Sequence, residues 1–570
     1  MMKRSTIKKV GFSLGAALIL LAAIGFLSYT GVVNITGQAN AAKVEPKYGG
    51  TIIAGNYLIA YDPKGFDPGM ANYNVDQFTS FFAEKLMYGD WAKGPMGTNE
   101  WDFTQTEWYP PHVLKGCLAE SWEWTDPLTL VFKLRKGIKF QNKPPVNGRE
   151  FVADDVVYSW NRLLKSPRVA KKRFACLDSV TAPDKYTVVF KLNKFIGEWR
   201  YLLGYGAYIG IYPHEMVEAG ADNWKNACGT GPFLVEKYVR GSSVTYARNP
   251  DYWGTVKLGG KEYKLPFADK IKLPIIRDRA TRIAAMRAGK IDILYSVRWD
   301  NAESLDKTNP ELNKLGVIVP DSFQVHFEMN NEVLKDIRVR KALNMGVDRD
   351  AIGKSLYGGK YAKFSYPFLA FWPKALYTPW DKLPPDVKEN YVYNPEKAKK
   401  LLAQAGYPKG FQTNLVYPQT YDDIAQMLVA YWSQIGVKVK MRVVEPNQIY
   451  SIMATKKFEG MIGVSDGGSG PLVAMRKQTP GEFWNPGKIN DAKLTELYDT
   501  VRQIHDVNEM NRQLKKANVY ALSLVPRFSS PAPYVYNYWQ PYIGGFHGEN
   551  CIGFFSPGPV FGRIWTTKSK

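Results

Sequence analysis

A strand–helix–strand unit in the second half of the chain constrains its fold more than any other feature. The stretch "FQTNLVYPQ" at 411–419 predicts a strand, and "YDDIAQMLVAYWSQIGVKVKMRVVE" at 421–445 predicts a helix followed by a second strand. A helix that connects two strands in this way is the usual crossover of a parallel sheet. We therefore expect an α/β fold.

An earlier region predicts additional antiparallel strands. Residues 128–135 alternate in the manner of a half-buried strand, and "YTVVFKLNKF" at 186–195 repeats their Val-Phe-Lys-Leu tetrad. The segment between them, "FVADDVVYSWNRLLKS" at 151–166, predicts an amphipathic helix. Two copies of a tetrad do not make a repeat protein, so we interpret them as two strands of one sheet.

The length of 570 residues predicts two or three domains, because one hydrophobic core does not grow that large. Apolar residues make up 45% of the chain and charged residues 22%, which is typical of a globular protein. The aromatic content of 14% fits either large cores or a wide ligand cleft lined by Trp and Tyr.

The first 42 residues predict an export segment. Four cations precede position 10, residues 10–33 carry no charge, and Ala39-Asn40-Ala41 supplies a cleavage site of the A-x-A type. The uncharged stretch is also long enough to span a bilayer. We therefore expect residues 1–42 to be a signal peptide or a retained N-terminal anchor. Either one places the rest of the chain in the periplasm or on the extracellular face of the cytoplasmic membrane.

Few residues are arranged for metal or cofactor chemistry. The five histidines are far apart, no H-x-x-x-H or phosphate-binding P-loop motif occurs, and we expect neither a metal nor a cofactor. The four cysteines form no C-x-x-C, so up to two disulfides or free buried thiols are both open. They are Cys117, Cys176, Cys228 and Cys551.

The net charge of +22 comes from dispersed lysines and arginines. No nucleic-acid-binding signature accompanies them, so we expect no nucleic acid partner. Attraction to an anionic membrane or wall surface is the simpler account for an exported protein.

The stretch "GCLAESWEWTDPLTLVFKLRKGIKFQNKPPVNGREFVADDVVYSWNRLL" at 116–164 is similar to the signature region of extracellular solute-binding proteins of family 5. These are the peptide-, nickel- and oligosaccharide-type receptors of ABC importers. Five other stretches match the family in the expected order, at 65–68, 229–253, 282–294, 327–352 and 398–411.

The resemblance implies two lobes joined by a hinge that close over a ligand, as in type II-like periplasmic binding proteins. It implies a monomer, not an enzyme, that delivers an oligopeptide- or oligosaccharide-sized solute to a membrane permease and its ATPase. Lobe 1 would contain a discontinuous domain and an inserted domain, and lobe 2 a single domain. The expected ranges are 43–78 with 226–300 and 531–570 for the discontinuous domain, 79–225 for the inserted domain, and 301–530 for lobe 2.

A competing interpretation is a secreted serine hydrolase. Residues 463–467 fit G-x-S-x-G, which would make Ser465 the nucleophile. A nucleophile elbow needs a helix directly after the serine, whereas Asp-Gly-Gly-Ser-Gly-Pro follows here, and no H-G-G-G oxyanion loop occurs. We expect this bend to bind a ligand.

The resemblance implies how this bend would bind. In peptide-binding members the corresponding strand end carries a Trp and then an Asp that receives the peptide's α-amino group. Ser465 lies about where that Trp would be and Gly468 about where that Asp would be, while Asp466 comes two positions early. Glycines and hydroxyls at this bend suit an oligosaccharide or another neutral polar compound, so both ligand classes stay open.

The remaining ligand contacts implied by the resemblance lie in the loop after the first strand, near the first crossing between lobes, and on tryptophans available for stacking. For Asn330 backbone hydrogen bonding at the hinge is an alternative role. These residues are Tyr61, Asp62, Phe66, Tyr295, Trp299, Asn330, Trp372 and Trp484.

Overall fold

The computed structural model describes residues 45–55, 62–104, 108–167, 169, 171–318, 322–364, 376–446, 448–466, 470–550, 552–553 and 556–568. The predicted export segment, residues 1–42, lies outside them. Within the described residues, no helix combines the length and the apolar character needed to cross a bilayer.

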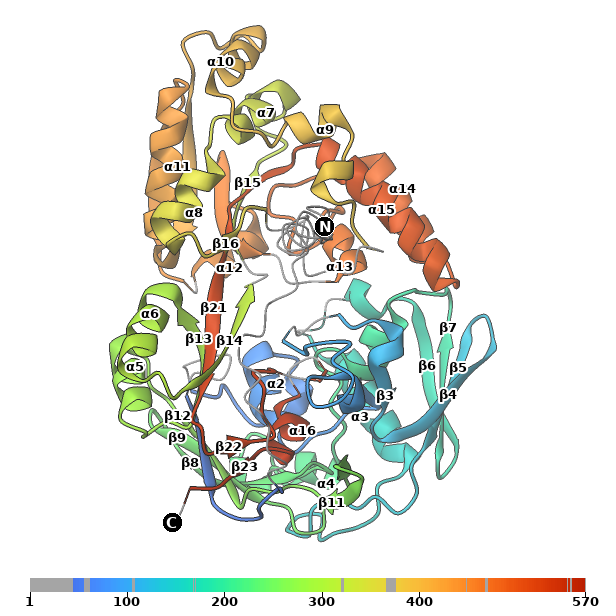
Figure 1. Ribbon diagram of the computed structural model, residues 1–570. Helices are drawn as coiled ribbons and strands as arrows, with labels where there is room; N and C mark the ends of the chain where they lie inside the picture. Colours follow the sequence, from blue (N-terminus) through green and yellow to red (C-terminus); the bar gives the residue numbers. More distant parts are fainter. Residues whose placement is uncertain are drawn as a thin grey trace, which may run out of the picture. The chain divides into compact units, whose positions relative to one another are not determined.

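The largest sheet has eight strands in the order β14–β21–β13–β1–β12–β9–β8, with β16 paired to β21. β1 runs parallel to both of its neighbours, and the other pairs are antiparallel. In Figure 1, α5 (Arg279–Arg287) and α6 (Trp299–Thr308) lie beside β13. The strands are β1 (Thr51–Gly55), β8 (Phe233–Val239), β9 (Ser243–Arg248), β12 (Lys270–Pro274), β13 (Ile293–Arg298), β14 (Asn313–Ile318), β16 (Tyr361–Ala362) and β21 (Ala532–Trp539).

A four-stranded antiparallel sheet, in the order β4–β5–β7–β6, packs against α3 (Ala153–Lys165) through buried Trp160 and Leu163. Its strands are β4 (Ala119–Asp126), β5 (Thr129–Leu134), β6 (Leu177–Asp184) and β7 (Thr187–Leu192). β5 pairs with β7, and Val131 lies opposite Val189. The two Val-Phe-Lys-Leu tetrads are therefore neighbours in one sheet, which confirms the prediction.

Short elements complete this half of the molecule, and one hydrophobic core joins most of them to both sheets. We call this half lobe 1. The elements are α2 (Tyr73–Thr79), β2 (Met87–Gly89), β3 (Leu114–Gly116), α4 (His214–Glu218), β10 (Thr255–Leu258), β11 (Lys261–Lys264), β22 (Ile543–Gly544), α16 (Pro557–Gly562) and β23 (Trp565–Thr566).

Lobe 2 is built on a five-stranded sheet in the order β18–β17–β19–β15–β20. β17 and β18 are parallel, and α11 (Asp422–Gln434) connects them, so the predicted strand–helix–strand unit is confirmed. The strands are β15 (Ser322–Phe327), β17 (Gln412–Pro418), β18 (Lys438–Val444), β19 (Met461–Asp466) and β20 (Arg527–Ser529).

Helices cover both faces of this sheet, because alternate strand residues enter different cores. Met461 packs in the core beneath α7, α10 and α11, whereas Ile462 packs towards α12. A third core joins α13, α14 and α15. The helices are α7 (Ile337–Met345), α8 (Arg349–Tyr357), α9 (Pro385–Glu389), α10 (Pro395–Gln404), α12 (Gln448–Thr455), α13 (Pro471–Arg476), α14 (Ala492–Val501) and α15 (Val507–Ser523).

Two crossings connect the sheets of the two lobes, and the short strand β16, which follows α8, also reaches the lobe 1 sheet by pairing with β21. β14 lies in the eight-stranded sheet and β15 in the five-stranded one, so the first crossing follows Ile318. The second lies between Ser529 of β20 and Ala532 of β21. We therefore propose that lobe 2 begins after Ile318, later than the expected residue 301, because β14 pairs with β21 and α6 packs in lobe 1.

Three cysteines, Cys117, Cys176 and Cys228, are buried free thiols. For these three cysteines the structure therefore favours free thiols over disulfides, a choice that the sequence leaves open. Cys551 lies outside the described residues.

Candidate functional site at two strand edges

The carboxyl ends of the parallel strands lie where the lobes meet. In lobe 1, β13 ends at Arg298, which pairs with Val535 near the start of β21. In lobe 2, β19 ends at Asp466, which pairs with Ser322 at the start of β15. Because β21 and β15 begin directly after the two crossings, both carboxyl edges lie at the crossings. Open α/β sheets bind ligands outside the carboxyl ends of their strands, so these two edges form the candidate site.

Asp466 is the carboxylate at the lobe 2 edge, where β19 ends, and its side chain is only 3% exposed. Its Oδ1 accepts a hydrogen bond from Lys477 Nζ at 2.9 Å, and its Oδ2 accepts one from Arg527 Nη1 at 2.9 Å. Burial alone would raise the pKa of Asp466, but the two cations hold it below its ordinary value. The carboxylate is therefore an internal counter-ion for two side chains of its own lobe.

Other groups around Asp466 are neutral or apolar. His326 Nε2 lies 4.0 Å from Asp466 Oδ2, and burial lowers the pKa of this histidine well below its usual range. Lys477 Nζ lies 4.9 Å from the ring centroid of Trp484, whose ring also meets Tyr450 edge-on at 6.4 Å. The predicted residues Asp466 and Trp484 are thus brought together through Lys477.

Ser465 lies one residue before Asp466 on β19 and is partly exposed. The next helix, α13, begins at Pro471 and not directly after the serine. His505 or His547, which follow Ser465 in the sequence, could supply the histidine of a serine hydrolase. His505 stacks on Phe195 of lobe 1, with ring centroids 3.5 Å apart. Among the described residues, no hydrogen bond joins Ser465 to a histidine, so the geometry gives no support for a Ser–His pair.

At the lobe 1 edge, Asp62 is held by its own chain. Its Oδ1 accepts hydrogen bonds from the Tyr238 hydroxyl at 3.0 Å and from the Gly241 amide at 2.7 Å, and Arg277 Nη2 lies 3.9 Å from its Oδ2. Phe66 is buried and packs edge-on against Tyr238 at 5.4 Å. The predicted residues Asp62 and Phe66 therefore share one partner, Tyr238, near this edge.

Trp299 and Tyr295 occupy packing positions near the crossings. Trp299 donates its Nε1 hydrogen to the Leu356 carbonyl of lobe 2 at 2.9 Å, and its ring covers Gly358, where a Cβ would fall 2.7 Å from the ring. Gly358 has a φ of +57°, so glycine suits this position on both counts. Tyr295 is buried edge-on against Phe546 at 5.8 Å.

Asn330 lies away from the candidate site. β15 starts at Ser322, opposite Asp466, and ends at Phe327, opposite Met461 at the start of β19. Asn330 follows Phe327 and is exposed, so it lies beyond the other end of this sheet. The structure thus does not bring it together with the other predicted residues. Tyr61, Trp372 and Gly468 lie outside the described residues.

Four residues at the two edges were not predicted from the sequence: Lys477, Arg527, Tyr238 and Arg277. Lys477 and Arg527 lie 11 and 61 residues from Asp466, and no local pattern links them to it. Only the placement of α13 and the pairing of β20 with β15 bring them together.

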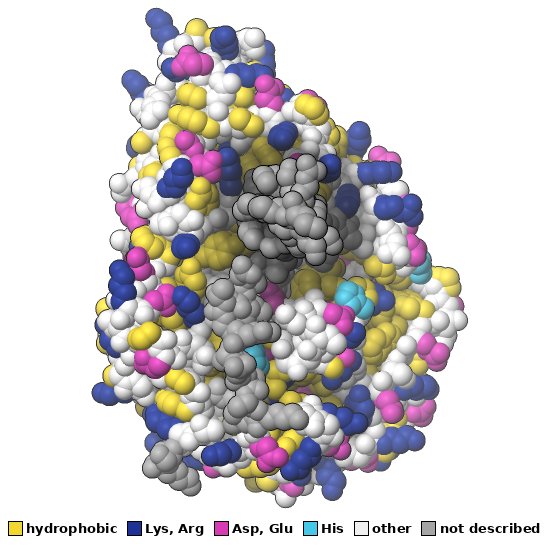
Figure 2. Space-filling model, viewed as in Figure 1, with side chains coloured by type: hydrophobic (Ala, Val, Ile, Leu, Met, Phe, Trp, Pro, Cys, Tyr) yellow, Lys and Arg dark blue, Asp and Glu magenta, His cyan; other side chains and the backbone are white. Residues whose placement is uncertain are grey.

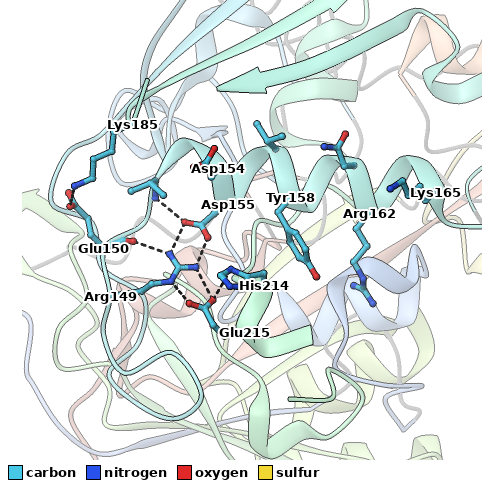
Figure 3. A pocket seen from close by; sticks show the side chains of 13 residues that line it. Arg149, Glu150, Asp154, Asp155, Tyr158, Arg162, Lys165, Lys185, His214 and Glu215 are labelled. Carbon is cyan, nitrogen blue, oxygen red and sulfur yellow. Dashed lines mark hydrogen bonds and ion pairs between the residues drawn. The ribbon is translucent and has the colours of Figure 1, made fainter. Parts of the chain in front are cut away.

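A groove of about 980 Å³ runs along α3, away from both edges (Figure 3). Arg149 lies in it and donates hydrogen bonds to Asp155 and Glu215, and Lys185 pairs with Glu150 at 2.6 Å. These charges satisfy one another, so we do not place the ligand there. Among the described residues no cluster of three or more His, Cys, Asp or Glu side chains could hold a metal ion.

Comparisons with known proteins agree with this architecture. The family described as bacterial extracellular solute-binding proteins, family 5 Middle, matches residues 113–476. Heme-binding protein A of Haemophilus influenzae is 29% identical over 413 residues, covering 67% of this chain and 68% of that protein. A putative ABC transporter peptide-binding protein of Brucella ovis is 31% identical over 434 residues, covering 71% and 76%.

Solved structures share the fold. The periplasmic binding protein DppA of Helicobacter pylori, in complex with the peptide STSA, has a TM-score of 0.72 at 22% identity and covers 92% of this chain and 99% of that one. AgaA of Agrobacterium tumefaciens, in complex with agropinic acid, has a TM-score of 0.71 at 22% identity and covers 91% and 99%. The expected two-lobed fold is confirmed, and no finding supports the hydrolase alternative. This chain belongs to the bacterial extracellular solute-binding proteins of family 5, the substrate-binding components of ABC importers.

Proposed function

We propose that this protein captures an oligomer-sized polar solute between the carboxyl edges of its two lobes and delivers it to a membrane permease and its ATPase. The observation that carries the proposal is the meeting of both carboxyl edges at the two chain crossings. Short crossings allow hinge motion, and a ligand that contacts both edges favours the closed state. No covalent step is required.

The charges at the edges bear on the class of ligand. A peptide's free α-amino group is recognised best by a carboxylate that has no other counter-ion. Asp466 is already paired with Lys477 and Arg527, and Asp62 with Tyr238, Gly241 and Arg277. We therefore favour a ligand without a free ammonium group at these two points, such as an oligosaccharide or a solute that carries hydroxyl groups.

An oligopeptide is the second candidate. The Brucella relative is named a peptide-binding protein and the Helicobacter pylori structure holds a peptide, whereas the Agrobacterium structure holds agropinic acid. A peptide would bind here through its backbone groups, with its amino group directed away from Asp62 and Asp466.

The protein is exported, and we propose that it works as a monomer in the periplasm or on the extracellular face of the cytoplasmic membrane. An uncleaved N-terminal segment would tether it there. Figure 2 shows Lys and Arg side chains scattered over the visible face, in keeping with the net charge of +22. Such a dispersed charge favours general attraction to an anionic surface.

Native mass spectrometry of residues 43–570, purified from the native host without refolding, tests the ligand class. Bound masses spaced by hexose units would support the oligosaccharide proposal. A ladder of peptide masses would overturn it and would support the second candidate. The Ser465→Ala variant is the matched control for catalysis, because a binder keeps its ligand whereas a serine hydrolase loses nearly all turnover.

A further inference from the structure

We propose that residues 195–199 of lobe 1 form a clasp with α13, α14 and α15 of lobe 2, and that this clasp determines how long a ligand is retained. The inference rests on the proposed function, because it requires lobes that open and close. In Figure 1 the clasp lies where α14 and α15 approach the four-stranded sheet, away from the crossings at β14 and β21.

The two sides of the clasp belong to different lobes. Residues 195–199 lie in the segment after β7, and Phe195, Ile196 and Trp199 are part of the lobe 1 core. α14 and α15 have their own core, to which Leu472 of α13 also belongs. Neighbouring Val473 packs in the lobe 1 core instead, so α13 contributes to both sides of the contact.

An aromatic stack forms the first part of the clasp. The His505 ring, in the loop between α14 and α15, stacks on Phe195 with centroids 3.5 Å apart and planes 20° from parallel. Trp124 of β4 meets His505 edge-on at 6.4 Å. Next to the stack, the Gly197 amide donates a hydrogen bond to the Arg502 carbonyl. Ring contacts of this kind stabilise a contact beyond the effect of the area that they bury.

A buried polar contact forms the second part. The Tyr498 hydroxyl of α14 donates a hydrogen bond of 3.5 Å to Glu198 Oε1, and Glu198 is buried. Burial lowers the pKa of Arg502, but the charges of its neighbours, Glu198 first among them, together outweigh this effect and raise it. Within the described residues, Glu198 Oε2 and Arg502 Nε are both buried without a hydrogen bond. The contact thus buries one polar atom of each lobe without a hydrogen bond, which costs free energy in the closed state and allows the contact to open again.

A glycine from each lobe allows the surfaces to approach. A Cβ on Gly197 would lie 2.6 Å from Met510 Sδ and 3.4 Å from the Arg502 carbonyl oxygen. A Cβ on Gly470 of lobe 2 would lie 2.7 Å from the ring of Trp108 in lobe 1. A larger side chain at either glycine would hold the lobes apart. This steric effect does not depend on the aromatic stack or on the polar contact.

The clasp stabilises the closed state whatever the ligand is, because none of its contacts involves the strand edges. A contact present only in the closed state shifts the opening equilibrium by its own free energy, and the release rate changes with it. Gly197, Glu198 and His505 are therefore positioning residues, which act on the ligand through lobe closure.

The test compares Gly197→Val with Lys194→Ala, an exposed position in the same loop. Small-angle X-ray scattering gives the radius of gyration of each protein as purified, and native mass spectrometry follows the release of the ligand that was retained on purification. We expect a larger radius for Gly197→Val and release about ten times faster, which corresponds to ~1.4 kcal/mol. Adding Met510→Ala, which removes the Sδ atom, should reverse part of both changes.

The His505→Ala variant tests the proposal if Gly197→Val does not fold, because His505 is an exposed loop residue. It should speed release by about threefold, since it removes the ring contacts of His505 with Phe195 and Trp124. A wild-type radius and release rate in folded Gly197→Val or His505→Ala would overturn the clasp. If the wild-type protein retains no ligand, the proposed function is in question, whereas the scattering comparison still decides the clasp.

Discussion

Glu84 in lobe 1 and Asp466 in lobe 2 are equally buried carboxylates, each 3% exposed, with opposite surroundings. The Glu84 carboxylate accepts hydrogen bonds from the Tyr252 hydroxyl at 2.8 Å and from Trp253 Nε1 at 2.9 Å, both uncharged donors. Asp466 accepts from two cations. Burial therefore raises the pKa of Glu84, whereas the cations lower that of Asp466. Equal burial gives opposite shifts, and the charge of the partners decides the sign.

The largest expected effect is at Asp466. Replacing it by Asn leaves Lys477 and Arg527 buried next to a neutral amide. Removing one partner of a buried ion pair costs about 3–5 kcal/mol of unfolding free energy. Denaturant unfolding at neutral pH measures the loss, with Ser465→Ala on the same strand as the control. A loss no greater than that of the control would mean that the two cations are stabilised in another way.

Glu84→Gln should lower the free energy of unfolding by less than Asp466→Asn does. The amide keeps one oxygen for the Tyr252 or Trp253 donor, and it leaves no cation behind. The expected loss is about 1–2 kcal/mol, typical of a buried hydrogen bond made imperfect. The same unfolding measurement checks it, with Tyr252→Phe as the matched change in a donor. A loss as large as that of Asp466→Asn would break the comparison, because uncharged donors would then matter as much as cations.

The pH dependence of stability should have opposite signs for the two groups. Glu84 has a raised pKa in the folded state, so its contribution is fully present below the unfolded value near 4.5 and is lost as the pH rises through the folded pKa. Asp466 has a lowered pKa, so its contribution is present above 3.8 and is lost as the pH falls through the folded pKa.

Unfolding free energies from about pH 3 to 8 test these signs. Glu84→Gln should flatten the upper part of the profile, and Asp466→Asn should flatten only its acidic end. If both substitutions changed the same part of the profile, the assignment of the two slopes would be wrong.

The pattern of apolar and polar residues within short stretches predicted the helices and strands of this fold well. The unit at 411–445 and the two tetrads were predicted because each depends on residues close in sequence. The resemblance implied that lobe 2 starts at residue 301, whereas we propose a start after Ile318, because β14 pairs with β21, where Val317 lies opposite Val535. No local pattern predicts this pairing. Pairing over such a separation is decided by the packing of the whole sheet.

The candidate site was less predictable for the same reason. Asp466 and Asp62 were expected as ligand contacts because of the resemblance to the family. The groups that engage them come from distant elements, such as Arg527 on β20 and Tyr238 on β8. A sequence shows a carboxylate at a strand end, but only the structure shows whether its charge is already balanced.

The smallest expected effect concerns the surroundings of Asp62. This carboxylate has both kinds of partner, the uncharged donors seen at Glu84 and a cation as at Asp466. It is partly exposed and keeps two uncharged donors, Tyr238 and Gly241, in addition to the more distant Arg277. Arg277 itself is largely exposed, so its substitution by Ala should change the unfolding free energy by no more than about 1 kcal/mol.

Arg277→Ala also sharpens the ligand proposal, because it removes the only cation with which Asp62 forms an ion pair among the described residues. Competition between retained ligand and added free dipeptide, followed by native mass spectrometry, measures the consequence. If the edge disfavours an ammonium group because Asp62 is balanced, the variant should accept the dipeptide more readily than the wild-type protein does. If the variant bound as much dipeptide as the wild-type protein or less, Asp62 would not be the residue that excludes an amino group. Asp466 alone would then determine which charge the ligand can carry.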